Sequence, residues 1–353
     1  MEKKNLNGRD TVNPYKNLIS VLTAQDLLKF VFYRASKVAL KSESRLDPVK
    51  KARFKELERV RIVERELLNK FNQYIKSYPN FNEVPPFYLE LTNVVVDGGV
   101  DRIKQILASL SKGIPVIKKI TASTIKRIKF SNNPREMANI RISYYGRISS
   151  FIKKYDGRFE ELNEFRRVLR KLPSIDPNIP TVVVAGYPNV GKSSLVKQIS
   201  TAKPEISYYP FTTKKIIVGK FNKDDINIQI IDSPGLLDRP LEKRNEIEMQ
   251  AILALRYLAK FIIYLFDPSE TCGYSVQDQI SLLNSLIKNF AQIPFIIVQN
   301  KIDLYDKNYN LDNKIQIDIP LRVFRTCLVE NVGIDEIVNF LIEKYEKYRY
   351  INL

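Results

Sequence analysis

Residues 186–193, which read Gly-Tyr-Pro-Asn-Val-Gly-Lys-Ser, constrain the fold of this chain more than any other stretch. They satisfy the Gly-x-x-x-x-Gly-Lys-Ser pattern of a phosphate-binding loop. An apolar run at 181–185 precedes them and predicts a buried strand, and a helix-like pattern follows. In that setting the glycines let backbone N–H groups surround phosphate oxygens at a helix N-terminus. The pattern therefore predicts a nucleotide-binding domain rather than a glycine-rich turn that binds nothing.

The second half of the chain alternates between short apolar runs and amphipathic stretches. The apolar runs predict strands near 181–185, 216–221, 226–231, 261–266, 294–299 and 322–327. The stretches between them predict helices near 192–200, 245–258, 276–290 and 333–347. Such alternation is typical of a P-loop α/β domain, with a mostly parallel sheet flanked by helices and the ligand at the carboxyl ends of the strands.

Asn300-Lys-Ile-Asp303, directly after a predicted strand, indicates that the base is guanine. A carboxylate at that point can accept hydrogen bonds from N1–H and the exocyclic amine of guanine, a donor pair that adenine lacks. A buried acceptor left unpaired costs about 1–3 kcal/mol, so the site would reject adenine. Thr326-Cys-Leu328 follows a later strand and fits the short loop that backs the base.

Asp232-Ser-Pro-Gly235 supplies a third element at the end of another predicted strand. Asp232 could hold Mg²⁺ through water, and the Gly235 N–H could meet the γ-phosphate. In phosphate loops of this kind the lysine, here Lys192, reaches the β- and γ-phosphates, and the hydroxyl of Ser193 can ligate the metal. These positions predict a site for a nucleoside triphosphate with its Mg²⁺.

Between these elements, Tyr208-Tyr-Pro-Phe-Thr-Thr-Lys214 predicts a switch loop whose threonine reaches Mg²⁺ only when the γ-phosphate is present. Either Thr212 or Thr213 could serve, and Thr213 is favoured. The predicted metal ligands are Ser193, Thr213 and Asp232, and the predicted catalytic residues are Lys192, Thr213 and Gly235. The predicted nucleotide-binding residues are Asn189, Val190, Gly191, Lys192, Ser193, Ser194, Phe211, Thr212, Thr213, Asp232, Gly235, Asn300, Lys301, Asp303, Thr326, Cys327 and Leu328.

The first half of the chain reads as helices. Apolar residues recur at helical spacing in three sets: Phe54, Leu57, Val60, Leu67, Phe71 and Tyr74; Ile103, Ile106, Leu107 and Leu110; and Leu162, Phe165, Leu169 and Leu172. Long amphipathic helices with short breaks predict a bundle. We expect a helical domain over 1–172, a proline-rich linker over 173–180 and the nucleotide domain over 181–353.

The net charge of +18 is concentrated in the first half. Residues 1–180 hold 36 Lys+Arg against 19 Asp+Glu, whereas residues 181–353 hold 21 against 20. An excess of that size attracts a polyanion, and recognition of phosphates and folded RNA is favoured over base reading because no aromatic ladder is present. The alternatives are an anionic membrane surface or mere solubility. The predicted RNA-binding residues are Lys118, Lys119, Lys126, Arg127, Lys129, Arg141 and Arg147.

The motifs together resemble translation-factor-type GTPases of the OBG-like group, and within it the nucleolar GTP-binding protein family. The resemblance also rests on five further stretches: Tyr78-Pro-Asn-Phe-Asn-Glu-Val-Pro-Pro-Phe-Tyr88, Leu172-Pro-Ser-Ile-Asp-Pro177, Leu236-Leu-Asp-Arg-Pro240, Ile247-Glu-Met-Gln-Ala251 and Glu270-Thr-Cys-Gly273. It spans nearly the whole chain and implies the short, archaeal form. It implies a helical bundle, a GTPase domain and a role with ribosomal RNA and pre-large-subunit particles.

Two residues bear on the mechanism that the resemblance implies. Leu236 stands where Ras-like enzymes place the glutamine that orients the attacking water. The chain has no histidine, so an imidazole base is excluded and we expect slow intrinsic hydrolysis accelerated in trans. In related GTPases an asparagine at the position of Asn189 accompanies potassium activation, but it could equally be a loop-forming residue.

Further expectations concern compartment and partners. Cys272 and Cys327 have no spacing typical of zinc or disulfides, and no apolar signal core or membrane span is visible, so we expect a cytoplasmic monomer that binds neither membrane nor DNA. Three functions stay open: a switch on nascent ribosomal RNA in large-subunit assembly, a GTPase acting on mature ribosomes or transfer RNA, and a signalling GTPase without RNA.

Overall fold

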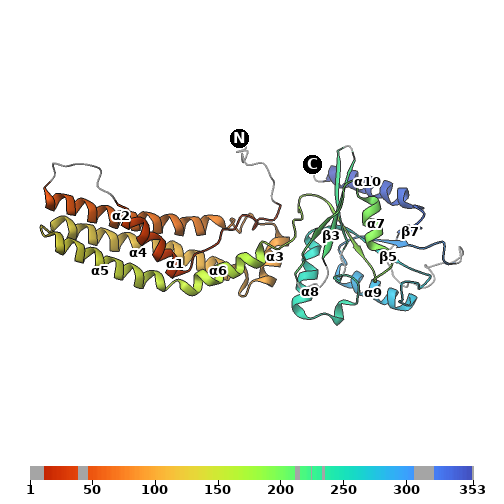
Figure 1. The fold of residues 1–353 in the computed structure, drawn as a ribbon. Helices are drawn as coiled ribbons and strands as arrows, with labels where there is room; N and C mark the ends of the chain where they lie inside the picture. The colour runs from red at the N-terminus through yellow and green to blue at the C-terminus, as the bar shows by residue number, and fades with distance from the viewer. Residues whose placement is uncertain are drawn as a thin grey trace. The chain divides into compact units, whose positions relative to one another are not determined.

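The structure, a computed structural model, describes residues 12–38, 47–210, 215–223, 225–232, 235–305 and 322–351 (Figure 1). These residues divide into two compact units. The helical unit comprises the described residues of 14–83 and 96–170. The sheet unit comprises residues 12–13, 84–95 and the described residues from 171 onward.

The helical unit confirms the predicted helical region. It contains α1 (Ala24–Ser36), α2 (Pro48–Ser77), α4 (Gly99–Phe130), α5 (Pro134–Lys153) and α6 (Asp156–Leu169). Asp47 and Asn133 accept N-cap hydrogen bonds, and a proline follows each at the first helical position, where its missing N–H costs nothing. Within the described ranges, no helix is long and apolar enough to cross a bilayer.

The buried face of α2 starts later than the sequence predicts. Leu67, Phe71 and Tyr74 are fully buried, as expected. Phe54, however, is 52% exposed, so its assignment to the core is wrong. Two residues along, Glu56 is buried instead, because two arginines compensate its charge. A period of apolar residues shows which residues share a face, and not which part of that face is covered.

The sheet unit contains seven strands among the described residues: β1 (Thr181–Ala185), β2 (Glu205–Ser207), β3 (Ile216–Lys223), β4 (Ile226–Asp232), β5 (Ala259–Phe266), β6 (Phe295–Gln299) and β7 (Arg322–Arg325). Their order is β2-β3-β4-β1-β5-β6-β7. β1 pairs in parallel with β4 and β5, and β5–β6 and β6–β7 are also parallel. The β2–β3 and β3–β4 pairs are antiparallel. The mostly parallel sheet is therefore confirmed, and only the short β2 has no predicted counterpart.

Helices flank this sheet, as the alternation predicts (Figure 1). They are α7 (Lys192–Ile199), α8 (Glu246–Leu253), α9 (Val276–Asn289) and α10 (Ile334–Ile351), with the short η1 (Leu241–Lys243) and η2 (Ala254–Tyr257). Helix α7 contacts β1, β3, β4 and α10. The loops after β1, β4, β5 and β6 leave the carboxyl edge of the parallel sheet, where this class of fold binds its ligands.

One helix from the first half of the chain, α3 (Pro86–Val95), belongs to the sheet unit. It packs on α8 and η2. The buried Tyr88 hydroxyl donates to the carbonyl oxygens of Pro173 (2.8 Å) and Ile175 (2.9 Å) and accepts from the Ile175 N–H (3.1 Å). The chain leaves the helical unit before α3 and re-enters it afterwards, so α3 is joined covalently to that unit at both ends.

Candidate functional site

The loop after β1 forms a hollow of about 410 Å³ lined by Pro188, Asn189, Gly191, Lys192, Ser193, Ser194 and Asp238. Gly186 and Gly191 have φ angles of 133° and 109°, which L residues with a side chain rarely adopt. Lys192 is buried, and its Nζ donates to the carbonyl oxygens of Gly186 (2.8 Å) and Tyr187 (2.7 Å). The ammonium thus lies at the mouth of the loop, where the sequence predicts that it meets phosphates.

The phosphate loop packs directly against the predicted base-binding motif. A Cβ at Gly191 would lie 2.5 Å from Asn300 Nδ2 and 3.0 Å from Leu328 Cδ1, so only glycine fits. The Asn300 amide donates to the Val190 carbonyl oxygen at 2.8 Å. Its Oδ1 accepts from the Thr326 hydroxyl and the Leu328 N–H, both at 3.2 Å. Asn300 therefore joins three of the predicted motifs through buried hydrogen bonds.

Ser193 and Asp232 are adjacent at the sheet edge, and the Ser193 hydroxyl donates to Asp232 Oδ2. Asp232 is fully buried. Mg²⁺ prefers oxygen ligands and is usually held by few protein groups together with phosphates and water. Among the described residues, no group of three or more acidic or cysteine side chains could hold a metal by itself. A hydroxyl beside a carboxylate fits an Mg²⁺ ion that a nucleotide brings with it.

Gly235 also lies at this site, and its N–H donates to Asp238 Oδ2 at 2.8 Å. Asp238 in turn accepts from Arg244 Nη2 at 3.0 Å, and the same nitrogen donates to the Leu236 carbonyl oxygen at 2.8 Å. The Arg244 side chain is only 4% exposed. The amide that the sequence assigns to the γ-phosphate is therefore bonded to a carboxylate that itself lines the phosphate hollow.

Asp303 lies at a second hollow, of about 490 Å³, whose lining also includes Tyr305, Arg325 and Val332. Its carboxylate is beside Cys327, whose thiol has a raised pKa because of burial first and then of its hydrogen bond to Asp303. Of the predicted base contacts, only Asp303 lines this hollow; Thr326, Cys327 and Leu328 do not. The roles of the individual residues stay predictions.

Lys301 reveals a group that the sequence analysis missed. Its backbone is left-handed, with φ 62°, and its Nζ donates to Asp267 Oδ2 at 2.7 Å and to the Thr271 hydroxyl at 2.8 Å. Asp267 is fully buried at the end of β5 and also accepts from the Cys272 N–H at 2.8 Å and from Ser269. Burial raises the pKa of Asp267, but the hydrogen bonds from Lys301 and Ser269 and the Lys301 charge outweigh it and lower the pKa below its ordinary value.

The predicted switch residues Phe211, Thr212 and Thr213 lie outside the described residues. Tyr209, just before them, is fully buried and donates its hydroxyl proton to the Ala251 carbonyl oxygen of α8 at 2.7 Å. Its ring centroid lies 6.5 Å from that of Phe87 in α3. Helix α8 follows the Asp232–Gly235 segment in the chain, so Tyr209 connects the flanks of both predicted switch segments with α3.

Most of the predicted RNA-binding cations face solvent on α4 and α5, namely Lys118, Lys119, Lys126, Arg127, Lys129 and Arg147. Arg141 differs, because its Nε donates to the buried Glu56 and its guanidinium lies 5.0 Å from the centre of the Tyr145 ring. The structure thus gives Arg141 a role in holding α5 on α2, and its contact with RNA stays a prediction.

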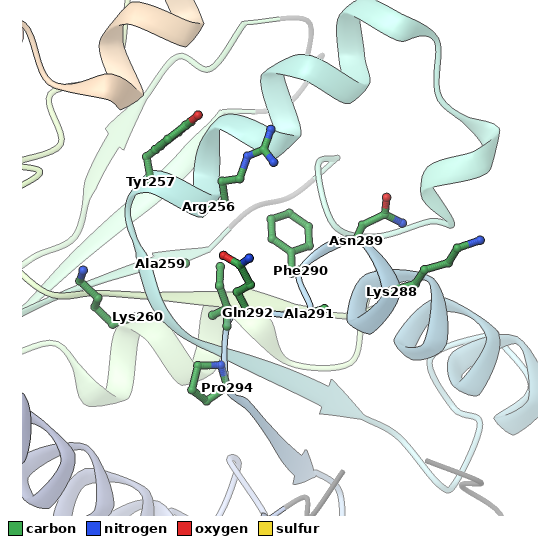
Figure 2. A pocket seen from close by; sticks show the side chains of 11 residues that line it. Arg256, Tyr257, Ala259, Lys260, Lys288, Asn289, Phe290, Ala291, Gln292 and Pro294 are labelled. Carbon is green, nitrogen blue, oxygen red and sulfur yellow. The ribbon is translucent and has the colours of Figure 1, made fainter. Parts of the chain in front are cut away.

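A further basic hollow lies where β5 and β6 begin, at the opposite ends of these strands from the motif loops (Figure 2). It measures about 520 Å³, and its lining includes Arg256, Tyr257, Lys260 and Lys288 and no acidic residue. Arg256 lies 5.6 Å from the centre of the Tyr257 ring. The sequence did not predict this hollow, because its three cations are spread over residues 256–288 and form no cluster along the chain.

Two family models match the chain. Residues 15–176 match the NOG1 N-terminal helical domain, and residues 246–303 match Nucleolar GTP-binding protein 1 (NOG1). The first match covers the helical unit and α3, and the second covers α8, β5, α9 and the Asn300–Asp303 motif.

Curated relatives give the same result. The uncharacterized protein MJ1408 of Methanocaldococcus jannaschii is 37% identical over 84% of this chain and 82% of its own length. Nucleolar GTP-binding protein 1 of Drosophila melanogaster is 32% identical over 82% of this chain, and that of Eremothecium gossypii is 31% identical over 94%. These alignments span only 45% and 52% of the two eukaryotic proteins. A crystal structure from Plasmodium falciparum is 33% identical, with a TM-score of 0.45 over 51% of this chain and 93% of the other.

Proposed function

Because the chain belongs to the nucleolar GTP-binding protein 1 family and is a GTPase, we propose that it acts as a GTP-dependent switch on ribosomal RNA during assembly of the large ribosomal subunit. The observation that carries the proposal is that the family likeness covers the basic helical unit as well as the part of the sheet unit that holds the Asn300–Asp303 motif. A likeness limited to the nucleotide-binding domain would say nothing about the function of the basic first half.

The residues of the sheet unit have distinct parts in binding and hydrolysis under this proposal. Lys192 transfers its hydrogen bonds from the loop carbonyls to the β- and γ-phosphate oxygens, where its charge stabilises the transition state. Asp303 accepts hydrogen bonds from the N–H groups of guanine, and Asn300 holds the phosphate loop beside the base-binding motif through its bond to Val190. A bound Mg²⁺, held by Ser193, Asp232 and Thr213, would neutralise phosphate charge.

Asn189 is the residue that would link the GTPase rate to potassium. Its φ of 62° lies in the left-handed region that asparagine tolerates better than most residues, which supports a loop-forming role. We include potassium activation as a separate part of the proposal, and GTPase rates measured in potassium and in sodium salts test it. Equal rates would remove potassium from the mechanism and leave the switch intact.

The RNA-facing part of the proposal rests on the exposed cations of α4 and α5. Changing Lys118, Lys119, Lys126 and Arg127 to glutamine should weaken RNA binding, because each change removes a charge that could contact a phosphate. Each lost contact also lowers the slope of log K against log salt concentration by about 0.7–0.9. The four changes should therefore reduce that slope by about 3. A matched control replaces four exposed cations of the sheet unit that line none of the three hollows described above: Lys197, Lys203, Lys215 and Lys223.

The deciding experiment is crosslinking and sequencing of RNA bound in cells, with the protein held by a non-hydrolysable GTP analogue. Crosslinks concentrated on large-subunit ribosomal RNA in immature particles support the proposal. Crosslinks mainly to transfer RNA or mature ribosomes would move the function to translation itself. Nearly no RNA would refute the RNA role, and with it the role in subunit assembly.

A further inference from the structure

The residue that orients the attacking water is missing from its usual place in this chain. Leu236, directly after Gly235, is apolar and only 2% exposed, so it cannot hold a water molecule at the γ-phosphate. Two residues further on, Asp238 is the sole acidic residue lining the phosphate hollow among the described residues. It is held there at both carboxylate oxygens, by the Gly235 N–H and by Arg244.

We propose that Asp238 is the water-positioning residue of GTP hydrolysis, with Arg244 as the residue that positions it. This inference rests on the proposed GTPase switch. The N–H of Gly235 is the bond donor that a γ-phosphate would take. When it does so, Asp238 Oδ2 loses that donor while Arg244 still holds Oδ1, which leaves one carboxylate oxygen facing the phosphate hollow.

Charge decides whether a carboxylate can lie this close to a triphosphate. Two like charges in a shielded site repel strongly, which by itself would push Asp238 out. Arg244 offsets this repulsion because its guanidinium is buried, with 4% exposure, and bonds to Asp238 at 3.0 Å. Glu248 is the other acidic neighbour of Arg244, at 4.0 Å from Nη1, and it also pairs with Arg239 at 3.4 Å.

In the proposed step, Asp238 Oδ2 accepts a hydrogen bond from the water and aims its oxygen at the γ-phosphorus. The water oxygen forms the new P–O bond as the bond from phosphorus to the bridging oxygen breaks. The bridging oxygen leaves with the electron pair as part of GDP. One water proton stays on the attacking oxygen and the other passes to a γ-phosphate oxygen, so phosphate leaves as H2PO4⁻, and Asp238 returns to Gly235 with its charge unchanged. The same carboxylate thus holds the empty loop and orients water in the filled one.

The test measures single-turnover GTP hydrolysis and, separately, affinity for a non-hydrolysable GTP analogue. Asp238→Ala should slow hydrolysis by about 10²-fold, the cost of losing the position of one reactant. Affinity for the analogue should stay equal or rise, because the Gly235 N–H loses a competing acceptor. Asp238→Asn keeps the size of the side chain but offers one acceptor to the Gly235 N–H and Arg244 together. It serves if the alanine variant fails to fold, and it should slow hydrolysis similarly.

Glu248→Gln is the matched control, since it removes the other carboxylate near Arg244 but not one that lines the phosphate hollow. Its hydrolysis rate should stay within about twofold of wild type. A purely structural role for Asp238 would change affinity and stability and leave the single-turnover rate unaltered, and that result overturns the proposal. Wild-type protein without any GTP hydrolysis, alone or with assembly particles, would instead refute the proposed function itself.

Discussion

Replacing Asp267 with asparagine tests whether its buried carboxylate holds the loop of Lys301, which the sequence predicts to bind the base. Asp267 is fully buried, and the Lys301 side chain is 21% exposed. Oδ2 accepts from Lys301, the Thr271 hydroxyl and the Cys272 N–H, and Oδ1 accepts from Ser269. An asparagine keeps the size of the group but turns one acceptor into a donor, so Lys301 or Ser269 must then face an N–H₂ group.

The magnitude follows from these exposures. Breaking a buried ion pair by removing one partner costs about 3–5 kcal/mol when both charges are enclosed. Lys301 retains some solvent, so a loss of about 2–3 kcal/mol in the free energy of unfolding is expected for Asp267→Asn. Nucleotide affinity should fall less, by about fivefold, because the network stabilises the free and bound protein alike and binding must only reorder the loosened loop.

Urea denaturation measures the first quantity and displacement of a fluorescent GDP analogue measures the second. Asp278→Asn is the control, as Asp278 is an exposed acid at the start of α9 in the same unit. An Asp267→Asn protein as stable as the control and with the affinity of the wild type would show that the ion pair is incidental to the loop.

The same carboxylate predicts a dependence on pH. The pKa of Asp267 in the folded protein lies below its ordinary value of 3.8, so its charged form stabilises the fold above about pH 4. That contribution is lost as the pH falls through the folded-state pKa. The wild type should lose stability more steeply than Asp267→Asn below pH 4, and parallel curves would contradict the assignment.

Three further changes test other parts of the structure. Tyr209→Phe removes the hydrogen bond from the hydroxyl to α8 and should lower the free energy of unfolding by about 1 kcal/mol. It should also weaken any difference in hydrogen exchange of α3 between the GDP and GTP-analogue forms. The control, Tyr264→Phe, removes a similar buried bond to Gln279 and should lower stability alone. Asp303→Asn should lower the affinity for GTP by tenfold or more and raise the affinity for xanthosine triphosphate, whose second carbonyl needs a hydrogen-bond donor. Competition between the two nucleotides measures this, and an unchanged preference would place the base elsewhere. Glu56→Gln leaves Arg141 without its counter-charge and should destabilise the helical unit by about 1–3 kcal/mol in urea denaturation, with equal stability counting against a structural role for the pair.

Local patterns in the chain were sufficient to predict the fold of the sheet unit and to select most of the candidate site residues that the structure brings together. A phosphate loop needs glycines, a lysine and a serine at fixed spacing after a strand, and all of these are neighbours in sequence. The residue motifs after β4 and β6 likewise carry their chemistry within four positions. Helical periodicity also predicted the bundle, although it misjudged Phe54, because periodicity shows which residues share a face and not what covers it.

Tertiary structure decided the features that depend on residues far apart in the chain. Helix α3 joins the sheet unit through contacts with α8 and η2 that lie about 150 residues away. Asp267 meets Lys301 across two strand ends, and Glu56 meets Arg141 across two helices. Asp238 and Arg244 are close in sequence, but only the folded chain pairs them with one another and places Asp238 at the phosphate hollow. Spacing along the chain describes one element at a time, whereas burial of a charge is possible only where another element brings its partner.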